Sequence, residues 1–519
     1  MLKNERGSTL LVVMVMILVF TVLGLSILST SIGGAKRTGI REEQVTGDLD
    51  KIRALTEAVA YIKEVIDSKY NQENPDMSTN AYNEMIEDSI INNEYGYQIE
   101  NITSENETIK EAEDFTRIFR VSNEPFSQIV YITGIPSFLK YAVGSRGTLT
   151  LNGSTYVEKG NIYANDKLVL TNQAKYIYHD EMLEEDTSFP SVRSETENLL
   201  FLETEEVEYC SNNCYKNGEK IGNFVPLSIN ELESAFQPIP PTYMKEENEY
   251  VDVDIEKTFK EKLKAAGFLG EHVDPYDLGI DEIILNGLTS PNVQLISSFN
   301  NIDFSHPNKK GYLHPGKGEQ DVYIDTNDLI VNEKSQWIII DGNVVIENTG
   351  TQLMNVSANI LITGNLTIRG DIAFDSTIYV LGDTMINNVN ISGYGDGELI
   401  LMTEGHLEIA RVNKFLGKEE VSSIKAYLYT NYEAEKAEVY AVGSILHIEG
   451  GIFAKGDLEI NAYRGKADEE NSVIKFTNES EPTASRLIIE NNKTLFLNQA
   501  QGLPKMDRLE VVTDLMKKE

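Results

Sequence analysis

Arg369, Asp371, Asp375 and Asp383 are the strongest candidates for acid–base chemistry in this chain. Enzymes that cleave polysaccharides need paired groups of this kind, so that one carboxyl group can donate a proton while another accepts one. Acidic residues at such spacings are also common in tight turns, because Asp accepts hydrogen bonds from the nearby backbone. The turn interpretation is favoured, and the sequence therefore predicts no catalytic residue and no enzyme.

Metal, cofactor and phosphate chemistry have little more support. His306 and His314 each precede proline and are expected in loops, whereas His406 and His447 lie beside apolar triplets and could stack on one face. The run Gly311-Tyr312-Leu313-His314-Pro315-Gly316-Lys317-Gly318 approaches a phosphate-binding loop, but it ends on glycine where a Ser or Thr should hold the metal. We expect no metal site and no cofactor.

Cys210 and Cys214 are the two cysteines of the chain. No histidine stands beside them to complete a metal site, so a small-loop disulfide is the favoured interpretation. Such a bond forms in oxidising, extracytoplasmic surroundings. It would act as a local staple.

The composition is strongly acidic. The chain has 519 residues, of which 82 are acidic and 45 are basic, giving a formal net charge of −37. Binding to nucleic acid needs a basic surface that neutralises phosphates, so no nucleic-acid partner is expected. The length predicts more than one domain.

The first element is an uncharged, mostly apolar run from Ser8 to Ala35, behind a short charged leader. A bilayer core about 30 Å thick needs about 20 apolar helical residues, and Leu10–Ile32 supplies such a length. Lys3 and Arg6 predict a cytoplasmic N-terminus and an extracytoplasmic remainder, hence a single-pass membrane protein. A plain signal anchor and a signal peptide cleaved near Ser29 are the alternatives.

The run Glu5-Arg6-Gly7-Ser8-Thr9-Leu10-Leu11 resembles the cleavage region of type IV pilin-like proteins. The resemblance implies a prepilin peptidase that cuts between Gly7 and Ser8, so that residues 1–7 are a leader. It also implies that the helix stays on the mature chain and packs beside other pilin-like subunits. Glycine suits the cut, because it has no side chain to obstruct the peptidase.

Two residues depart from the common pilin pattern. Ser8 stands where Phe or Met is usual, and Val12 stands where the family usually has Glu. In the family that Glu pairs with the N-terminal amine of a neighbouring subunit inside the membrane, where a lone charge is costly. A subunit with Val12 has no such charge to satisfy. It is similar in this respect to PilX-type minor pilins, which implies a minor or tip subunit.

Beyond the apolar run, Val45, Leu49, Ile52 and later apolar residues recur at spacings of three and four. This pattern predicts that one transmembrane and stalk helix covers residues 8–70. Residues 94–135 contain three runs rich in aromatic and β-branched residues, which predict a small antiparallel sheet.

The outer part is predicted to be a parallel β-solenoid. Residues 141–174 and 335–462 contain apolar triplets separated by Gly, Asn and Asp. From Ile360 to Ile378 the step is about six residues, so three steps make one turn of three short strands. The strands of an antiparallel sandwich, which is the alternative, are longer and more widely spaced. This pattern of short apolar runs separated by Gly, Asn and Asp resembles the repeats of bactofilins and of the outer domains of PilX-like proteins.

Two segments are assigned to other structure. Residues 175–334 are predicted to be an acidic mixed insertion, in which Asp254 caps a helix that ends at Gly267. Residues 463–519 are predicted to be a C-terminal tail, in which Leu487–Ile489 and Leu495–Leu497 add strands that cap the open end of the solenoid.

The sequence thus predicts a mainly β protein with a long N-terminal helix, displayed on the cell surface. The predicted function is that of a minor or tip subunit of a type IV pilus or related filament, involved in assembly or attachment. The alternative is a signal-anchored adhesin whose solenoid binds a surface glycan or protein. A polysaccharide-acting enzyme is less favoured still.

Overall fold

The structure of the chain is a computed structural model. It describes residues 8–518 apart from 74–78, 107–108, 110–114, 135, 180, 196–197, 246–251, 271, 300–303, 305, 307, 317, 319, 326–327, 332–334, 411–422, 444, 471–472, 493–501, 505–507 and 515. The chain divides into two compact units. The N-terminal unit spans residues 1–106, 111–133 and 509–519, and the solenoid unit spans residues 107–110 and 134–508.

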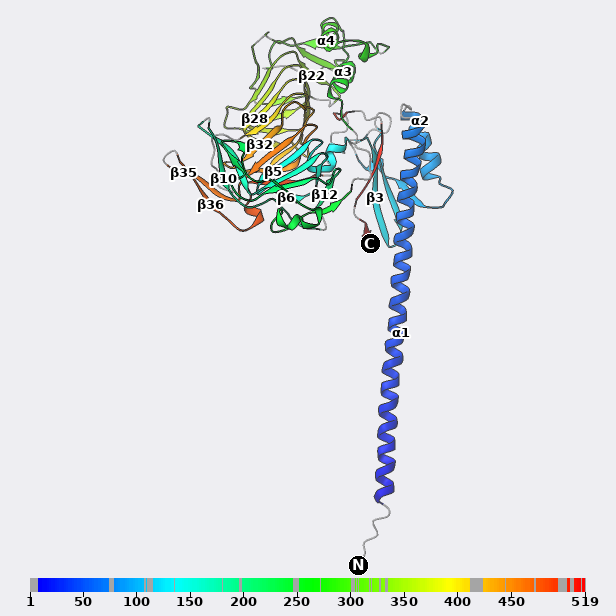
Figure 1. Ribbon diagram of the computed structural model, residues 1–519. Helices are drawn as coiled ribbons and strands as arrows, with labels where there is room; N and C mark the ends of the chain where they lie inside the picture. The colour runs from blue at the N-terminus through cyan, green and yellow to red at the C-terminus, as the bar shows by residue number, and fades with distance from the viewer. Residues whose placement is uncertain are drawn as a thin grey trace, which may run out of the picture. The chain divides into compact units, whose positions relative to one another are not determined.

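Helix α1 (Ser8–Val65) is continuous over its 58 residues (Figure 1). At 1.5 Å per residue it is about 87 Å long. Three short helical segments follow, namely η2 (Ile66–Gln72), α2 (Thr79–Ile86) and η3 (Glu87–Ile91). The predicted long N-terminal helix is confirmed.

A small antiparallel sheet belongs to the same unit. Its strands are β1 (Gln98–Asn101), β2 (Arg117–Asn123), β3 (Phe126–Thr133), β38 (Glu510–Thr513) and the short β39 (Lys517–Lys518). The predicted antiparallel sheet is confirmed, but two of its strands come from the C-terminal end of the chain. Strands β38 and β39 belong to the predicted tail, but both pair with β3 and cover its edge. Leu487–Ile489, which were predicted to cap an open end, are instead paired on both sides within the solenoid, and Leu495–Leu497 lie outside the described residues.

Two long sheets form the framework of the solenoid unit, and their strands run parallel apart from the antiparallel pair β13–β16. The first sheet contains, in spatial order, β17 (Thr242–Met244), β12 (Leu199–Leu202), β7 (Asn161–Ala164), β4 (Tyr141–Ser145), β33 (Leu446–Ala454), β31 (Ile424–Thr430), β29 (Leu399–Thr403), β27 (Ser376–Val380), β25 (Asn359–Ile362), β22 (Trp337–Ile340), β19 (Gly311–His314) and β18 (Val293–Leu295). The second contains β16 (Val225–Pro226), β13 (Val207–Cys210), β8 (Lys167–Thr171), β5 (Thr148–Gly153), β34 (Leu458–Ala462), β32 (Ala437–Ala441), β30 (Leu407–Ala410), β28 (Thr384–Gly393), β26 (Leu366–Phe374), β23 (Val344–Glu347) and β20 (Val322–Ile324).

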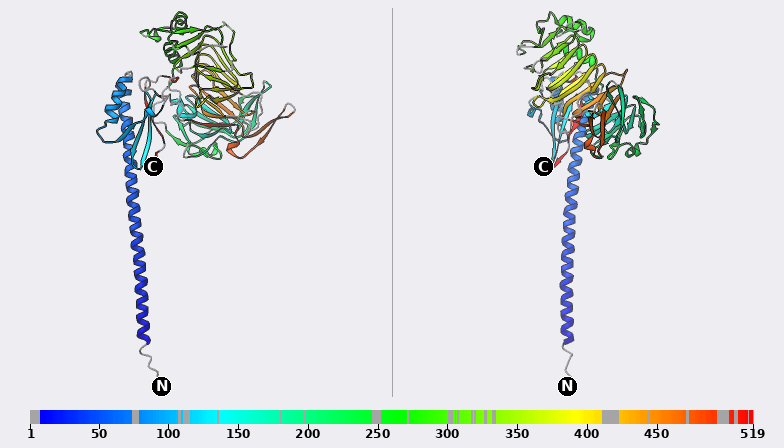
Figure 2. Two further views of the ribbon diagram at one scale, coloured as in Figure 1. Left: turned by 180° about the vertical axis from the view of Figure 1, so that it is seen from behind. Right: turned by 90° about the vertical axis from the view of Figure 1, so that its left-hand side faces the viewer.

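Further strands pair beside these two series. They are β37 (Leu487–Glu490), β6 (Tyr156–Lys159) and β11 (Ser191–Val192), next to β33, and β21 (Asp328–Ile330) and β24 (Met354–Ser357), next to β26. Three two-stranded pairs stand apart, namely β9 (Gln173–Tyr178) with β10 (Glu181–Asp186), β14 (Tyr215–Lys216) with β15 (Glu219–Lys220), and β35 (Gly465–Glu470) with β36 (Val473–Asn478). Figure 2 shows the stacked strands of the solenoid from two further sides.

The predicted turn of the solenoid agrees with the register of its strands. Ile360 pairs with Ile378 in the first sheet, and Leu366 pairs with Thr384 in the second. The hydrogen bond from the Thr377 N–H to Asn359 Oδ1 likewise spans 18 residues. Ile360 and Ile378 are fully buried in the core between the sheets. The predicted parallel sheets are therefore confirmed.

Glycine followed by Asn or Asp makes a repeated corner between the two sheets. Asn343 Oδ1 accepts the N–H of Asn365 at 3.0 Å, and Asn365 Oδ1 accepts the N–H of Asp383 at 2.8 Å. A Cβ on Gly364 would lie 2.5 Å from Asn343 Oδ1, and one on Gly382 would lie 2.2 Å from Asn365 Oδ1. Glycine is needed here because the neighbouring turn approaches so closely.

The chain begins to wind the solenoid at a middle turn. Strands β4 to β17 build one end, after which β18 to β34 start from the other end and return. At the meeting point β33 pairs with β4, β34 pairs with β5, and β37 lies between β33 and β6. We call this meeting of β4, β5, β6 with β33, β34, β37 the closure.

The prediction that residues 175–334 are an insertion is wrong in large part. Strands β11, β12 and β13 pair with β6, β7 and β8, and β18 to β21 build the far end of the solenoid. These strands are only two to four residues long, and β13 and β21 carry an acidic residue, so they resemble loop segments in the sequence. Helices α3 (Ile255–Ala265) and α4 (Ile280–Gly287) lie between them. Helix α3 agrees with its prediction, since Asp254 Oδ1 accepts the Lys257 N–H at 2.8 Å and Gly267 follows with φ +83°.

Candidate functional site: the apolar segment of helix α1

The N-terminal part of α1 exposes large apolar side chains on every side. The exposed fraction ranges from 47% for Val19 to 70% for Phe20. A helix that is apolar all round is normally buried, and large exposed apolar surfaces mark sites of interaction. We call these residues the apolar segment: Val12, Val13, Met14, Val15, Met16, Ile17, Leu18, Val19, Phe20, Val22, Leu23, Leu25 and Leu28.

The C-terminal part of the same helix is packed against the antiparallel sheet. Leu55, Ala58 and Ile62 are at most 2% exposed and belong to one core with Phe119 and Val130 of β2 and β3. On the outer side of this part, Arg53 and Glu57 form an exposed ion pair at 2.9 Å. The helix is therefore amphipathic where the sheet covers it and apolar all round where nothing described covers it.

The C-terminal end of the chain holds this packed part in place. Asn71 Nδ2 donates to the Leu509 carbonyl at 3.0 Å, and Asn71 Oδ1 accepts the Leu509 N–H at 2.8 Å. Lys518 pairs with Asp48 of α1 at 2.6 Å. These contacts help to hold the C-terminal part of α1 on the sheet, and the apolar segment extends from that part.

The residues predicted for processing and assembly lie at the start of this helix. Ser8 is the first residue of α1, and Gly7 lies outside the described residues. Val12 is 50% exposed within the apolar segment. Processing at Gly7 and the assembly role of Val12 remain predictions.

The structure does not support the predicted membrane-spanning helix. Across the part of the chain that the structure describes, no helix combines the length and the apolar character that a membrane crossing requires. The predicted spanning helix at Leu10–Ile32 is therefore not supported.

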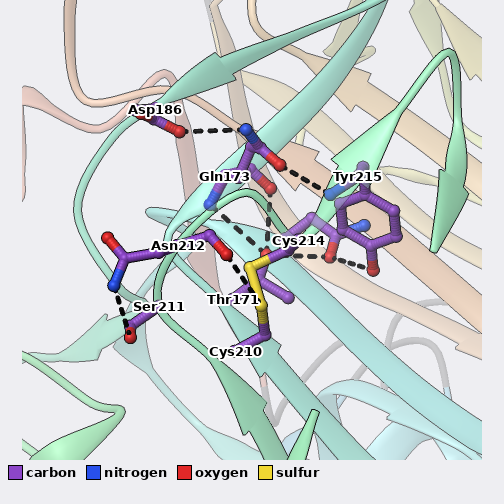
Figure 3. The surroundings of a disulfide bond; sticks show 9 residues. Thr171, Gln173, Asp186, Cys210, Ser211, Asn212, Cys214 and Tyr215 are labelled. Carbon is purple, nitrogen blue, oxygen red and sulfur yellow. Dashed lines mark hydrogen bonds between the residues drawn. A yellow bond between two sulfur atoms is a disulfide. The ribbon is translucent and has the colours of Figure 1, made fainter. Parts of the chain in front are cut away.

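Cys210 and Cys214 are joined by a disulfide in the structure, with Cα atoms 5.8 Å apart (Figure 3). The loop that they close is held against the β9–β10 hairpin. Gln173 accepts the Tyr215 N–H at 2.8 Å and donates from Nε2 to Asp186 at 3.0 Å (Figure 3). The residue directly after the disulfide loop, Tyr215, is thus linked through Gln173 to both strands of the hairpin.

Two buried charges, Glu459 and Lys175, and the partly exposed Lys436 form a group beneath that hairpin, on the outer side of β34. The Glu459 carboxylate pairs with Lys175 of β9 and, at 2.6 Å, with Lys436. Burial alone would raise the pKa of Glu459, but the two ammonium groups outweigh it and lower that pKa. For Lys175 burial is the larger influence, and it lowers the pKa because it disfavours the charged ammonium group. This group spans the closure, because β34 and β9 come from opposite ends of the winding.

Asn491 and Asn492 fasten the chain directly after β37. Asn491 Nδ2 donates to the Tyr141 carbonyl at 3.1 Å and to Tyr427 Oη at 2.7 Å. Asn492 Nδ2 donates to Glu398 at 2.5 Å. Glu398 is 5% exposed, and burial raises its pKa to about 7.

The four residues considered for acid–base chemistry are used in contacts between neighbouring turns. Asp371 accepts from Asn390 Nδ2 at 2.6 Å, and Asp383 accepts the His406 N–H at 2.8 Å. Asp375 accepts from Ser357 Oγ at 3.3 Å, and Arg369 Nε donates to Asn387 at 3.3 Å. These contacts favour the turn interpretation.

The two histidines beside apolar triplets do not stack on one face. His406 precedes β30 in the second sheet and lies 3.0 Å from the Lys436 carbonyl, whereas His447 is part of β33 in the first sheet. His447 instead meets Glu158 and Glu490, a group that the sequence reasoning missed. The three residues lie far apart in the sequence, so no local motif predicts the group. The sequence indicates only that each of them alternates with apolar residues and therefore faces outward from its strand.

Comparisons with known proteins give little further information. No family model matches the sequence, and no curated protein matches it. Among solved structures, the competence-associated pilin ComZ from Thermus thermophilus aligns over 81% of this chain and 88% of that chain, with 9% identity and a TM-score of 0.19. An alignment with this TM-score supports no conclusion about fold or function.

Proposed function

We propose that this chain is a minor or tip subunit of a type IV pilus or a related filament, which displays its solenoid on the cell surface. Other pilin-like subunits would cover the apolar segment, and a prepilin peptidase would prepare the chain by cutting after Gly7. The solenoid would then serve assembly or attachment.

One observation carries this proposal. Helix α1 is continuous, yet its C-terminal part is buried on a sheet while the apolar segment exposes apolar side chains on all sides. A lone molecule gains nothing from such a surface, because each exposed apolar side chain forgoes about 1.5–3 kcal/mol of burial. Packing among similar helices would recover that free energy.

The lack of charge at Val12 supports the minor or tip position. Val12 lies among apolar neighbours, and none of the residues in the apolar segment is ionisable. The segment would therefore pack by apolar contact, with no ion pair to fix its register. That property suits a subunit that is present once or a few times.

Processing is the sharpest test of this proposal. In the native host, the mature protein is expected to begin at Ser8, and Gly7→Trp is expected to retain the leader and to be absent from sheared filament fractions. Gly279→Trp is the matched control, because a Cβ at Gly279 meets nothing within 4 Å and Gly279 lies outside helix α1. The measurements are the intact mass and the amount of protein in the filament fraction.

Two outcomes would contradict the proposal. A mature protein that starts beyond Ile32 would mean that the helix is removed as a signal peptide. An uncut Gly7→Trp variant that is displayed as well as the natural protein would favour the anchored adhesin.

A further inference from the structure

Three potential metal ligands from distant parts of the chain meet at the closure. Glu158 of β6, His447 of β33 and Glu490 of β37 each offer a ligand atom, and these atoms all lie within 4.8 Å of one another. The order of strands across the sheet is β33, β37, β6. Neighbouring parallel strands lie about 4.8 Å apart, so side chains on adjacent strands that point the same way can share one ion.

The pleat of the strands turns all three side chains outward. Leu446 and Ile448 lie in the core on either side of His447, and Ile489 and Val157 precede Glu490 and Glu158 in the same core. Since successive side chains in a strand alternate between faces, the three ligands share the outer face. Their side chains are 29–35% exposed, so an ion in solution can reach them.

The pairing of β37 with β6 is irregular beside Glu158. Ile489 pairs with Val157, but the next residue, Glu490, pairs with Lys159, so Glu158 is passed over. Such a bulge changes the direction of a side chain, and bulges are common beside functional sites. Without it, Glu158 would stand directly opposite Glu490 in the regular register.

Two of these groups contact each other directly, and the third makes only a long ion pair. His447 Nε2 lies 2.9 Å from Glu490 Oε1, and the ion pair between Glu158 and Arg193 is long, at 3.8 Å. Two ligand atoms that each lie about 2.1 Å from a zinc ion are at most about 4.2 Å apart. Small side-chain rotations therefore suffice to bring all three atoms onto one ion.

We propose that Glu158, His447 and Glu490 bind a divalent transition-metal ion, with Zn²⁺ as the best fit. One imidazole and two carboxylates suit Zn²⁺ better than Ca²⁺ or Mg²⁺, which prefer oxygen ligands alone. Three protein ligands leave a coordination position for water. The ion would tie the first turn of the winding, β6, to the last strands, β33 and β37, and so lock the closure.

The test uses the full-length protein after treatment with a chelator. Titration calorimetry with ZnCl₂ is expected to show one ion bound per chain, and Zn²⁺ is expected to raise the melting temperature of the solenoid unit, since a ligand that binds only the folded state stabilises it. His447→Ala is expected to weaken binding at least about tenfold, as a lost ligand should cost no less than a lost supporting contact.

Two further variants make the result decisive. His406→Ala removes a histidine elsewhere in the solenoid and should bind Zn²⁺ like the natural protein, which separates the site from general attraction to an acidic surface. Glu158→Gln changes a partly exposed side chain and serves if His447→Ala fails to fold. The proposal is overturned if the natural protein binds no Zn²⁺, or if both ligand variants bind it as tightly as His406→Ala.

Discussion

The N-terminal unit and the solenoid unit both depend on segments far apart in the chain, but they join them by different means. In the N-terminal unit, β38 pairs with β3, and Leu509 is 2% exposed in an apolar core with Ile62 and Val130. In the solenoid unit, parallel strands meet at the closure and bury charge, with Glu459 between Lys175 and Lys436.

This difference determines how each unit responds to change. Apolar contacts lose stability in proportion to the atoms removed and depend little on pH. Removing one partner of a buried ion pair costs about 3–5 kcal/mol, because the remaining buried charge has no water to replace the lost partner. The solenoid unit is therefore the part of the chain in which a single substitution or a change of pH should have its largest effect.

The largest effect is expected for Glu459→Ala. The variant leaves Lys175 and Lys436 close together without their shared carboxylate, which should destabilise the solenoid unit by about 3–5 kcal/mol. Hydrogen–deuterium exchange should show faster exchange at β5 and β34 with little change in β2 and β3. Glu449→Ala removes a partly exposed carboxylate 3.7 Å from Lys425 and is the control, with an expected loss of at most about 1 kcal/mol. Equal effects of the two would contradict the role of the buried charges.

Ile62→Ala should destabilise the N-terminal unit and leave the solenoid unit unchanged. Ile62 is fully buried between α1 and the sheet, so the substitution should cost about 2–5 kcal/mol and speed exchange in β2, β3 and β38. Val45→Ala, at a position 59% exposed on the same helix, should stay within about 0.5 kcal/mol. Faster exchange in the solenoid strands of Ile62→Ala would mean that the two units do not unfold independently.

Glu398→Gln should reveal the pH dependence of the solenoid unit. The ordinary pKa of Glu is 4.5, and burial raises that of Glu398 to about 7. Between these values the unfolded chain loses the proton while the folded chain keeps it, so this residue lowers stability as pH rises from 4.5 to about 7. The glutamine variant should therefore be more stable than the natural protein by about 3 kcal/mol near pH 8 and equal to it near pH 4.

Urea denaturation at several pH values measures this difference. The stability of the N-terminal unit is an internal reference, because the substitution lies outside that unit. A stability gain that does not vary with pH would show that Glu398 does not titrate in this window.

The smallest effect on stability is expected for Phe20→Ser. Phe20 is 70% exposed, so the variant should change the stability of the isolated chain by less than about 0.5 kcal/mol. If other helices cover the apolar segment, the same variant should nevertheless reduce the amount of protein in filament fractions. Thr21→Ser, at the next position, is the matched control. Normal incorporation of Phe20→Ser would count against the assembly role of the segment.

Several elements could be predicted because their determinants are local. Helix α1 follows from its apolar run and the spacing of Leu49 and Ile52, and α3 follows from the cap at Asp254. The spacing from Ile360 to Ile378 gives the turn of the solenoid, because equivalent residues stack directly on one another. Each of these patterns lies within a few tens of residues.

The elements that were missed depend on outward-facing residues or on distant partners. Strand β13 begins Val207-Glu208, and its acidic outer face resembles a solvated loop in sequence. Strand β38 is too short to be assigned to a sheet until β3 offers its edge. The group of Glu158, His447 and Glu490 exists only because β37 lies between two strands that are remote from each other in the chain.

The sequence by itself determined the kinds of structure: a long helix with an apolar beginning, a small sheet and a stack of short parallel strands. Hydrogen bonds within the helix and the repeated alternation of apolar residues encode these features over short distances. Only the tertiary structure decided that the solenoid is wound from its middle, that its closure buries charge, and that the C-terminal strand completes the N-terminal sheet. Those outcomes depend on which strand edges meet, and the free energy of such a meeting belongs to both partners together.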